Sequence, residues 1–139
     1  MTGTLRILVT GSRTWGTRPS PNGPVPDQRQ HDRLVEALRC AAKGAQRPVL
    51  VVGDCPTGAD AIATRYARRW GWRVEVHTAL WGVYGSHAGP RRNAEMVRAG
   101  ADICLVFLNE LNGKPSRGTR NCMRLAREAG IKTKAWEAT

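Results

Sequence analysis

Pro48-Val49-Leu50-Val51-Val52 is a continuous apolar run, and the glycine-bearing segment Gly53-Asp54-Cys55-Pro56-Thr57-Gly58 follows it directly. A short strand that is apolar at every position is typical of a parallel sheet covered on both faces. Residues 57–70 then carry apolar side chains at helical spacing, and Gly71 follows them, which predicts an amphipathic helix. This part of the chain is therefore predicted to be a strand, a glycine-rich junction and a helix.

The same unit recurs along the chain. Strands are predicted over residues 5–10, 48–52, 72–77, 103–108 and 131–136, and helices over residues 32–43, 57–70, 90–99 and 119–129. Strands that alternate with helices favour a parallel sheet with right-handed crossovers. The 139 residues fit one domain. We therefore expect a single-domain, Rossmann-like three-layer α/β sandwich over residues 1–139, with a mostly parallel five-stranded sheet.

Composition narrows the classes of partner. No apolar run approaches the roughly 20 residues of a membrane span, and the first residues lead straight into a strand pattern instead of a signal peptide. A cytoplasmic location without a membrane partner is the default expectation.

The net charge of +11 comes from 22 Lys and Arg against 11 Asp and Glu. This excess suits nucleic acid or another anion, but the basic residues are spread over helix surfaces, so a solvated basic surface explains them equally well.

The four cysteines form no Cys-x-x-Cys pair, and no histidine cluster accompanies them, so no metal site is expected. Cys40 and Cys104 lie in apolar patterns and are predicted to be buried thiols.

Two connections are long for an α/β protein. Residues 11–28 are rich in Pro and Gly and form either a mobile loop or a lid over a site. Within them, Trp15 either stacks on a base or anchors the loop. Residues 78–88 form a second predicted loop.

Four polar, glycine-bearing segments follow the predicted strands. In such sheets ligands bind outside the carboxyl ends of the strands, so all four segments should meet at one edge. Glycine lets backbone N–H groups approach a ligand closely, and a helix N-terminus favours anions. The segments predict a pocket for a phosphate-bearing molecule: Gly11-Ser12-Arg13, Gly53-Asp54-Cys55-Pro56-Thr57-Gly58-Ala59-Asp60, Gly89-Pro90-Arg91-Arg92-Asn93 and Ser116-Arg117-Gly118-Thr119.

In the first segment, Gly11 allows a tight turn, Ser12 can donate to a phosphate, and Arg13 can bind one through two nitrogens. The alternative is a plain turn that ends the strand. Because the first strand is central in this topology, the ligand-binding interpretation is favoured.

In the second segment, Gly53, Asp54 and Gly58 lie at a predicted helix start that suits an anion, although no lysine follows as in a Walker A loop. Thr57 with Asp60 predicts a capping box. The Asp60 carboxylate either caps the helix or holds a ribose hydroxyl.

In the third segment, Pro90 suits the first position of a helix, which would place two arginines and Asn93 in the first turn after Gly89. Positive side chains oppose the helix dipole there, so they predict an anionic ligand or a carboxylate partner, with Arg92 the main candidate. In the fourth segment, the hydroxyls of Ser116 and Thr119 can cap a helix or donate to a phosphate beside Gly118.

Taken in order, these motifs resemble the SLOG superfamily, and within it the YspA-like branch. The resemblance implies a Rossmann-like fold that binds nucleotides or nucleotide-derived molecules similar to NAD or ADP-ribose. It also implies a homo-oligomer, for which Leu111 and Trp136 are interface candidates.

A related branch, the LOG enzymes, cleaves the N-glycosidic bond of cytokinin nucleotides. Residues 92–96 resemble its Arg-Lys-x-x-Met helix, and Gly118-Thr119 resembles part of its Pro-Gly-Gly-x-Gly-Thr-x-x-Glu loop. The glutamate of that loop falls at Cys122, so cleavage would need Glu95 or Asp60 to take the role of the missing acid.

Three functions follow from these observations. The first is a protein, such as a ligand sensor, that holds a nucleotide, and this bound nucleotide is the one cofactor candidate. The second is a nucleotide N-glycosidase in which Arg92 stabilises charge and Glu95 serves as acid or base. The third is a nucleic-acid-binding domain, suggested by the charge.

Overall fold

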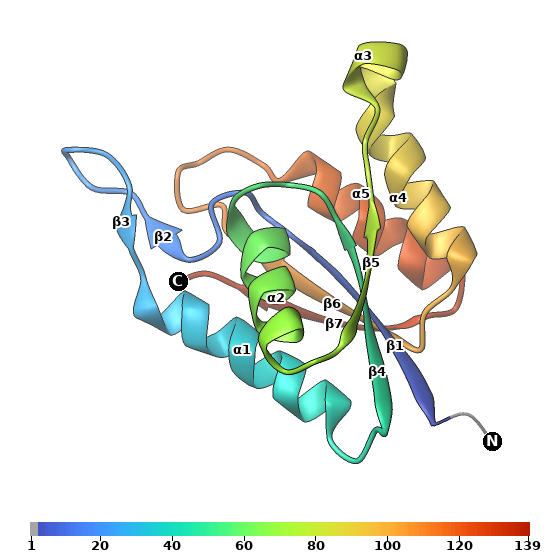
Figure 1. The fold of residues 1–139 in the computed structure, drawn as a ribbon. Helices are drawn as coiled ribbons and strands as arrows, with labels where there is room; N and C mark the ends of the chain where they lie inside the picture. The colour runs from blue at the N-terminus through green and yellow to red at the C-terminus, as the bar shows by residue number, and fades with distance from the viewer. Residues whose placement is uncertain (1–2) are drawn as a thin grey trace.

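The computed structural model describes residues 3–139, and in this part of the chain five parallel strands form one sheet (Figure 1). The order across the sheet is β5-β4-β1-β6-β7, with β1 in the centre. This order, which places β4 and β6 on either side of β1, is that of a doubly wound sheet. The strands are β1 (Thr4–Gly11), β4 (Arg47–Gly53), β5 (Arg73–His77), β6 (Ile103–Leu108) and β7 (Lys132–Glu137).

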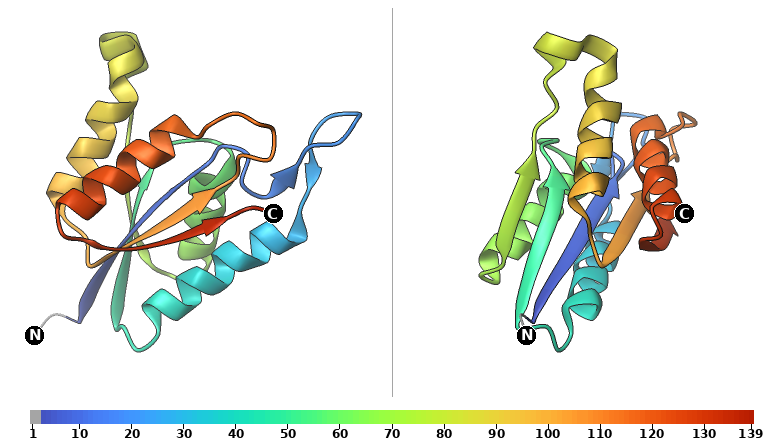
Figure 2. Two further views of the ribbon diagram at one scale, coloured as in Figure 1. Left: turned by 180° about the vertical axis from the view of Figure 1, so that it is seen from behind. Right: turned by 90° about the vertical axis from the view of Figure 1, so that its right-hand side faces the viewer.

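Four helices cover the two faces of the sheet. Helices α1 (Gln28–Ala42) and α2 (Gly58–Arg69) lie in front of it in Figure 1. Helices α4 (Ala88–Ala99) and α5 (Arg117–Glu128) lie in front of it in the reverse view of Figure 2. The predicted three-layer, Rossmann-like α/β sandwich is therefore confirmed, and its sheet is entirely parallel.

The central strand shows why both faces carry apolar residues. Side chains alternate across a strand, and Ile7 and Val9 pack toward α1 and α2 whereas Leu8 packs toward α4 and α5. All three are fully buried. Each such side chain contributes about 1.5–3 kcal/mol through removal from water. A central strand buried on both faces leaves only its two ends accessible, and in sheets of this topology ligands bind at the carboxyl end.

Helix α1 begins at Gln28, four residues before the predicted start at position 32. Asp27 caps it, because Oδ1 of Asp27 accepts a hydrogen bond from the Gln30 amide at 3.1 Å. Arg18 donates to the other carboxylate oxygen at 2.7 Å and lowers the pKa of Asp27. The first turn is polar, so hydrophobic periodicity could not reveal it.

The long connection over residues 11–28 contains a small hairpin, β2 (Thr17–Arg18) paired with β3 (Val25–Pro26). Trp15 anchors the start of this connection. Its indole Nε1 donates to the Gln30 carbonyl at 2.8 Å. Its ring packs against that of Phe107, with the two ring centroids 5.2 Å apart. Because Trp15 is buried in the core, it belongs to the framework of the loop and not to a base-stacking surface.

Residues 78–88 are more regular than the loop predicted there. They contain α3 (Trp81–Tyr84) and a 3-10 turn (Gly85–His87) that leads directly into α4. Helix α4 therefore starts two residues before Pro90, and its arginines lie further along the helix than the predicted first turn.

Cys104 is buried as predicted, but the prediction for Cys40 is wrong, because its thiol is exposed on α1 beside Glu36. No helix within residues 3–139 combines the length and apolar character needed to cross a bilayer.

Candidate ligand-binding site

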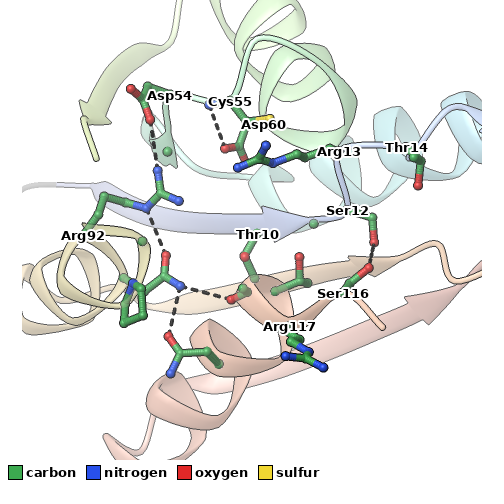
Figure 3. Close-up of a pocket in the computed structure, with 18 of the residues that line it drawn as sticks. Thr10, Ser12, Arg13, Thr14, Asp54, Cys55, Asp60, Arg92, Ser116 and Arg117 are labelled. Carbon is green, nitrogen blue, oxygen red and sulfur yellow. Dashed lines mark hydrogen bonds and ion pairs between the residues drawn. The ribbon is translucent and has the colours of Figure 1, made fainter. Parts of the chain in front are cut away.

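A cleft of about 830 Å³ opens at the carboxyl edge of the sheet, where β1, β4 and β6 end (Figure 3). This volume is in the range of small-molecule sites. All four predicted segments contribute to its lining. The predicted residues found there are Gly11, Ser12, Arg13, Gly53, Asp54, Asp60, Gly89, Arg92, Asn93, Ser116, Gly118 and Thr119.

Thr57 and Gly58, which were also predicted to bind ligand, are not among the described residues that line the cleft. The Thr57 hydroxyl donates to the Arg13 carbonyl at 3.1 Å and makes no capping bond to α2, so the predicted capping box is wrong. Gly58 has a φ of +73°, and a Cβ there would lie 2.2 Å from the Ser12 carbonyl oxygen. Ala59 donates its amide to that same oxygen at 3.3 Å. These residues hold the start of α2 against the end of β1.

Glu95, the acid suggested for cleavage, is exposed on α4 and is not part of the described lining. Its Oε1 lies 3.4 Å from Nδ1 of His77. The structure thus brings Arg92 into the cleft and leaves Glu95 outside it.

Ser12 connects three chain segments at the floor of the cleft. Its amide donates to the Phe107 carbonyl at 2.9 Å, and its Oγ accepts from the Asn109 amide at 2.8 Å. The same Oγ shares a hydrogen bond with the Ser116 hydroxyl, which for that reason does not cap α5 (Figure 3). The ends of β1 and β6 and the start of α5 are therefore held in one arrangement.

Sequence reasoning missed Asn109, which organises the loop beside the cleft. Its Nδ2 donates to the carbonyls of Thr14 and Thr17, at 2.8 Å each. The side chain is 4% exposed, so these bonds are shielded from water. A polar residue placed directly after the apolar run of residues 103–108 was the signal available for it.

Arg92 is held in the cleft by two hydrogen bonds (Figure 3). Its Nη1 lies 3.1 Å from Oδ1 of Asp54, and its Nε donates to Oδ1 of Asn93 at 3.0 Å. Asn93 in turn donates through Nδ2 to the Gly118 carbonyl at 3.0 Å and to Oδ1 of Asn121 at 3.1 Å. Both amide hydrogens of Asn93 are thus used to join α4 to α5, and Asn93 positions Arg92.

Asp60 presents a buried carboxyl group to the cleft. It is 7% exposed, and its Oδ2 accepts from the Cys55 amide at 3.3 Å. Burial raises the pKa of Asp60 to about 6, and the nearby Arg92 guanidinium opposes this shift. A Cβ on Gly53 would lie 2.5 Å from Nη1 of Arg92 and 2.8 Å from Oδ2 of Asp60. Glycine at position 53 is what lets both groups reach the backbone.

The N-terminus of α5 faces the cleft. Glu110 accepts from the Ser116 amide at 2.6 Å and from Nε of Arg120 at 2.9 Å, which fixes the loop before the helix. These bonds lower the pKa of Glu110 to about 2, with the Arg120 bond the larger cause. The amides of the first turn, residues 117–119, have no partner within a helix by geometry. All three residues line the cleft, and amides at a helix N-terminus favour negative charge.

The lining is positively charged overall. Its basic side chains are Arg13, Arg92, Lys114 and Arg117, whereas the acids among its described residues are Asp54, already paired with Arg92, and Asp60. Within residues 3–139 no group of His, Cys, Asp and Glu side chains has a metal-binding arrangement. The predictions did not single out Lys114, Arg117 or Trp81 as ligand contacts.

A parallel α/β sheet with glycine-bearing junctions around a cleft at its carboxyl edge is the architecture of Rossmann-like ligand-binding proteins. The chain belongs to the YspA, cpYpsA-related SLOG family, whose model matches residues 5–84. The membership predicted from the motifs is therefore confirmed. The matched range includes the first two segments of the cleft and ends before Gly89.

The chain is also similar to the Gene 61 protein of Mycobacterium phage D29. The two are 42% identical over 133 residues, which cover 91% of each chain. No solved structure was found to match the chain.

Proposed function

We propose that this protein binds a nucleotide or a nucleotide-derived molecule of the NAD or ADP-ribose type in the cleft, and holds it without cleaving it. The observation that carries the proposal is the joint presence of three guanidinium groups and the first turn of α5 around one cavity. Arg13, Arg92 and Arg117 all line the cleft that the α5 amides face. Membership of the SLOG family supports a ligand of this class.

A phosphate is best accommodated at the start of α5. The first-turn amides there would donate to its oxygens, and the helix dipole would stabilise its charge. Thr119 adds a hydroxyl donor, and Arg117 adds a guanidinium that can bind through two nitrogens. Ser12 has its Oγ engaged by Asn109 and Ser116, so its main contribution is to hold this position in shape.

The other half of the cleft offers groups suited to a ribose. The Asp60 carboxyl can accept from hydroxyls, and Arg92 lies beside it, held in a single orientation by Asp54 and Asn93. A group fixed before binding loses less conformational entropy when the ligand arrives. We therefore propose that Arg92 contacts the ligand between its phosphate and its ribose.

Two observations favour holding over cleavage. The position of the LOG-loop glutamate is occupied by Cys122, a fully buried thiol that is not among the described residues lining the cleft. Glu95 is directed toward His77. A second candidate, an N-glycosidase, rests on one feature: Asp60 is a carboxyl group in the cleft whose pKa of about 6 suits general acid catalysis.

Thermal-shift measurements with AMP, ADP-ribose and NAD, followed by product analysis, distinguish the two functions. Binding without turnover predicts a ligand-dependent rise in Tm and intact ligand after incubation. Arg92→Ala should abolish the rise, whereas Arg98→Ala, an exposed arginine on the same helix, should retain it. Release of a free base that disappears in Asp60→Asn would instead establish the glycosidase.

We also propose that the protein works as a homodimer in the cytoplasm. Leu111 is 37% exposed and remains available to a partner, whereas the Trp136 ring stacks on Phe107 within its own chain at 5.1 Å. Light scattering on the wild type and on Leu111→Ser tests this, and a wild-type monomer would contradict it.

A further inference from the structure

A second surface combines aromatic rings with unneutralised positive charge, on the face formed by α1 and α2. We call it the arginine–aromatic face. It consists of Arg39, Arg65, Arg68, Arg69, Tyr66, Trp70, Trp72 and Arg73. Helices α1 and α2 lie side by side there (Figure 1).

This face is separate from the cleft. Helix α2 starts at Gly58 beside the carboxyl end of β4 and returns along the sheet to the start of β5 at Arg73. Residues 66–73 therefore lie toward the amino edge of the sheet, at the opposite end from the cleft. None of the eight residues of the face belongs to the cleft lining.

The rings form a continuous row. Tyr66 and Trp70 have centroids 5.5 Å apart, and Trp70 and Trp72 are 5.4 Å apart. All three rings pack against the core on one side and remain partly exposed on the other. Packing against the core fixes their positions, so a partner that stacks on them would order few side chains.

Two arginines lie over these rings. Cζ of Arg69 is 4.9 Å from the Tyr66 ring centroid, and Cζ of Arg39 is 5.3 Å from the Trp70 ring centroid. A guanidinium held against a ring keeps its outer plane and its N–H groups available to solvent. Such planes can stack on bases, and the N–H groups can bind phosphates.

The charge of this face is uncompensated. Residues 61–73 contain four arginines and no acid. Throughout residues 3–139, the ion pairs involve other basic residues and none of the five arginines of this face. All five are exposed. On α2, Arg65 lies three and four residues before Arg68 and Arg69, a spacing at which like charges repel each other, and an anionic partner reduces that repulsion.

We propose that the arginine–aromatic face binds single-stranded nucleic acid. The phosphates of such a strand would bind the positive charges, and its unpaired bases would stack on the rings and guanidinium planes. A duplex keeps its bases stacked internally and could not use these planes. An acidic protein would satisfy the charge alone. The proposal stands independently of the cleft, because the two sites share no residue.

Fluorescence anisotropy with a labelled oligothymidine of about 20 nucleotides tests this, at salt concentrations between about 50 and 200 mM. The triple variant Arg65→Ala, Arg68→Ala, Arg69→Ala should bind at least about tenfold more weakly. Its log–log salt slope should be shallower by about 2, since each lost phosphate contact removes about 0.7. The control triple variant Arg98→Ala, Arg127→Ala, Lys132→Ala removes the same charge from exposed positions outside this face and should bind like the wild type.

Competition experiments test the contribution of the rings. A duplex of the same length and poly-glutamate of similar charge should each compete at least about tenfold less well than the single strand. Trp70→Leu keeps an apolar contact with the core and should weaken binding several-fold without changing the salt slope. Equal losses in the two triple variants, or equal competition by poly-glutamate or duplex, would overturn the proposal. So would the absence of binding at about 50 mM salt.

Discussion

Arg92 on α4 and Asp54 in the loop after β4 form an ion pair across the cleft, with Nη1 of Arg92 3.1 Å from Oδ1 of Asp54. A second bond joins Nε of Arg92 to Asn93 at 3.0 Å. The guanidinium is therefore oriented before any ligand arrives. This orientation is what the proposed function requires of Arg92.

Arg92→Lys should keep the charge but lose most of the ligand-dependent rise in Tm. A lysine ammonium cannot satisfy Asp54 and Asn93 together in the planar arrangement that the guanidinium uses. The Tm without ligand should change little, because ion pairs of this partly exposed kind contribute weakly to folding. A thermal shift with ADP-ribose that equals the wild-type value would contradict the role given to Arg92.

Gly58→Ala should destabilise the fold strongly. The residue has a φ of +73°, and the added Cβ would lie 2.2 Å from the Ser12 carbonyl oxygen. We expect a loss of about 3 kcal/mol or more in the free energy of unfolding. Gly71→Ala is the matched control, because Gly71 has a φ of +77° but open space around its Cβ position. It should lose only about 1 kcal/mol, from the backbone conformation alone. Equal losses in urea unfolding would show that the contact between α2 and β1 is unimportant.

Asp60 should lower the stability of the fold at neutral pH. Burial raises the pKa of Asp60 to about 6, above the value of about 3.9 in an unfolded chain. The folded state thus binds this proton more tightly. The protonated carboxyl therefore adds to the free energy of unfolding. This contribution is complete below about pH 4 and is lost as the pH rises through about 6.

The variant Asp60→Asn removes this titration. Near pH 7.5 it should exceed the wild type in stability by up to about 3 kcal/mol, and near pH 4 the two should converge. Glu75 and Glu110, whose pKa values are lowered to about 2, affect both proteins alike and cancel in the difference. A stability difference that stays constant from pH 4 to 7.5 would rule out the raised pKa.

Glu110 should control affinity through the loop that precedes α5. Its carboxylate accepts from the Ser116 amide and from Arg120, so Glu110→Ala releases the start of the helix. Calorimetry with ADP-ribose should give a several-fold larger Kd. Glu128→Ala, which removes the partner of Arg124 at the other end of α5, should leave Kd unchanged. Equal Kd values in both variants would show that Glu110 does not control the affinity of the cleft.

The strands were predictable because buried strands consist of consecutive apolar residues, as in residues 48–52 and 103–108. The start of α1 was not, because residues 28–31 are polar and their helical state depends on the cap at Asp27. The pairing of β2 with β3 involves two residues on each side, too few to form a pattern.

The site was predictable at the level of segments, because topology alone brings the carboxyl ends of parallel strands together. The separate roles of the residues within each segment could not be predicted. Thr57 and Asn93 lie in the predicted segments, yet their polar groups hold neighbouring chain segments. The role of Asn109 depends on contacts with residues more than 75 positions away, which no local pattern records.

Hydrogen–deuterium exchange with and without ADP-ribose tests most directly whether the four segments bind one ligand. We predict slower exchange in residues 11–14, 53–56, 89–93 and 116–119 together, with the largest change in the first turn of α5. Exchange in the arginine–aromatic face should not change. Slower exchange in none of the four segments, with AMP, ADP-ribose and NAD each tested at saturating concentration, would contradict the proposal that the cleft binds a ligand of this class.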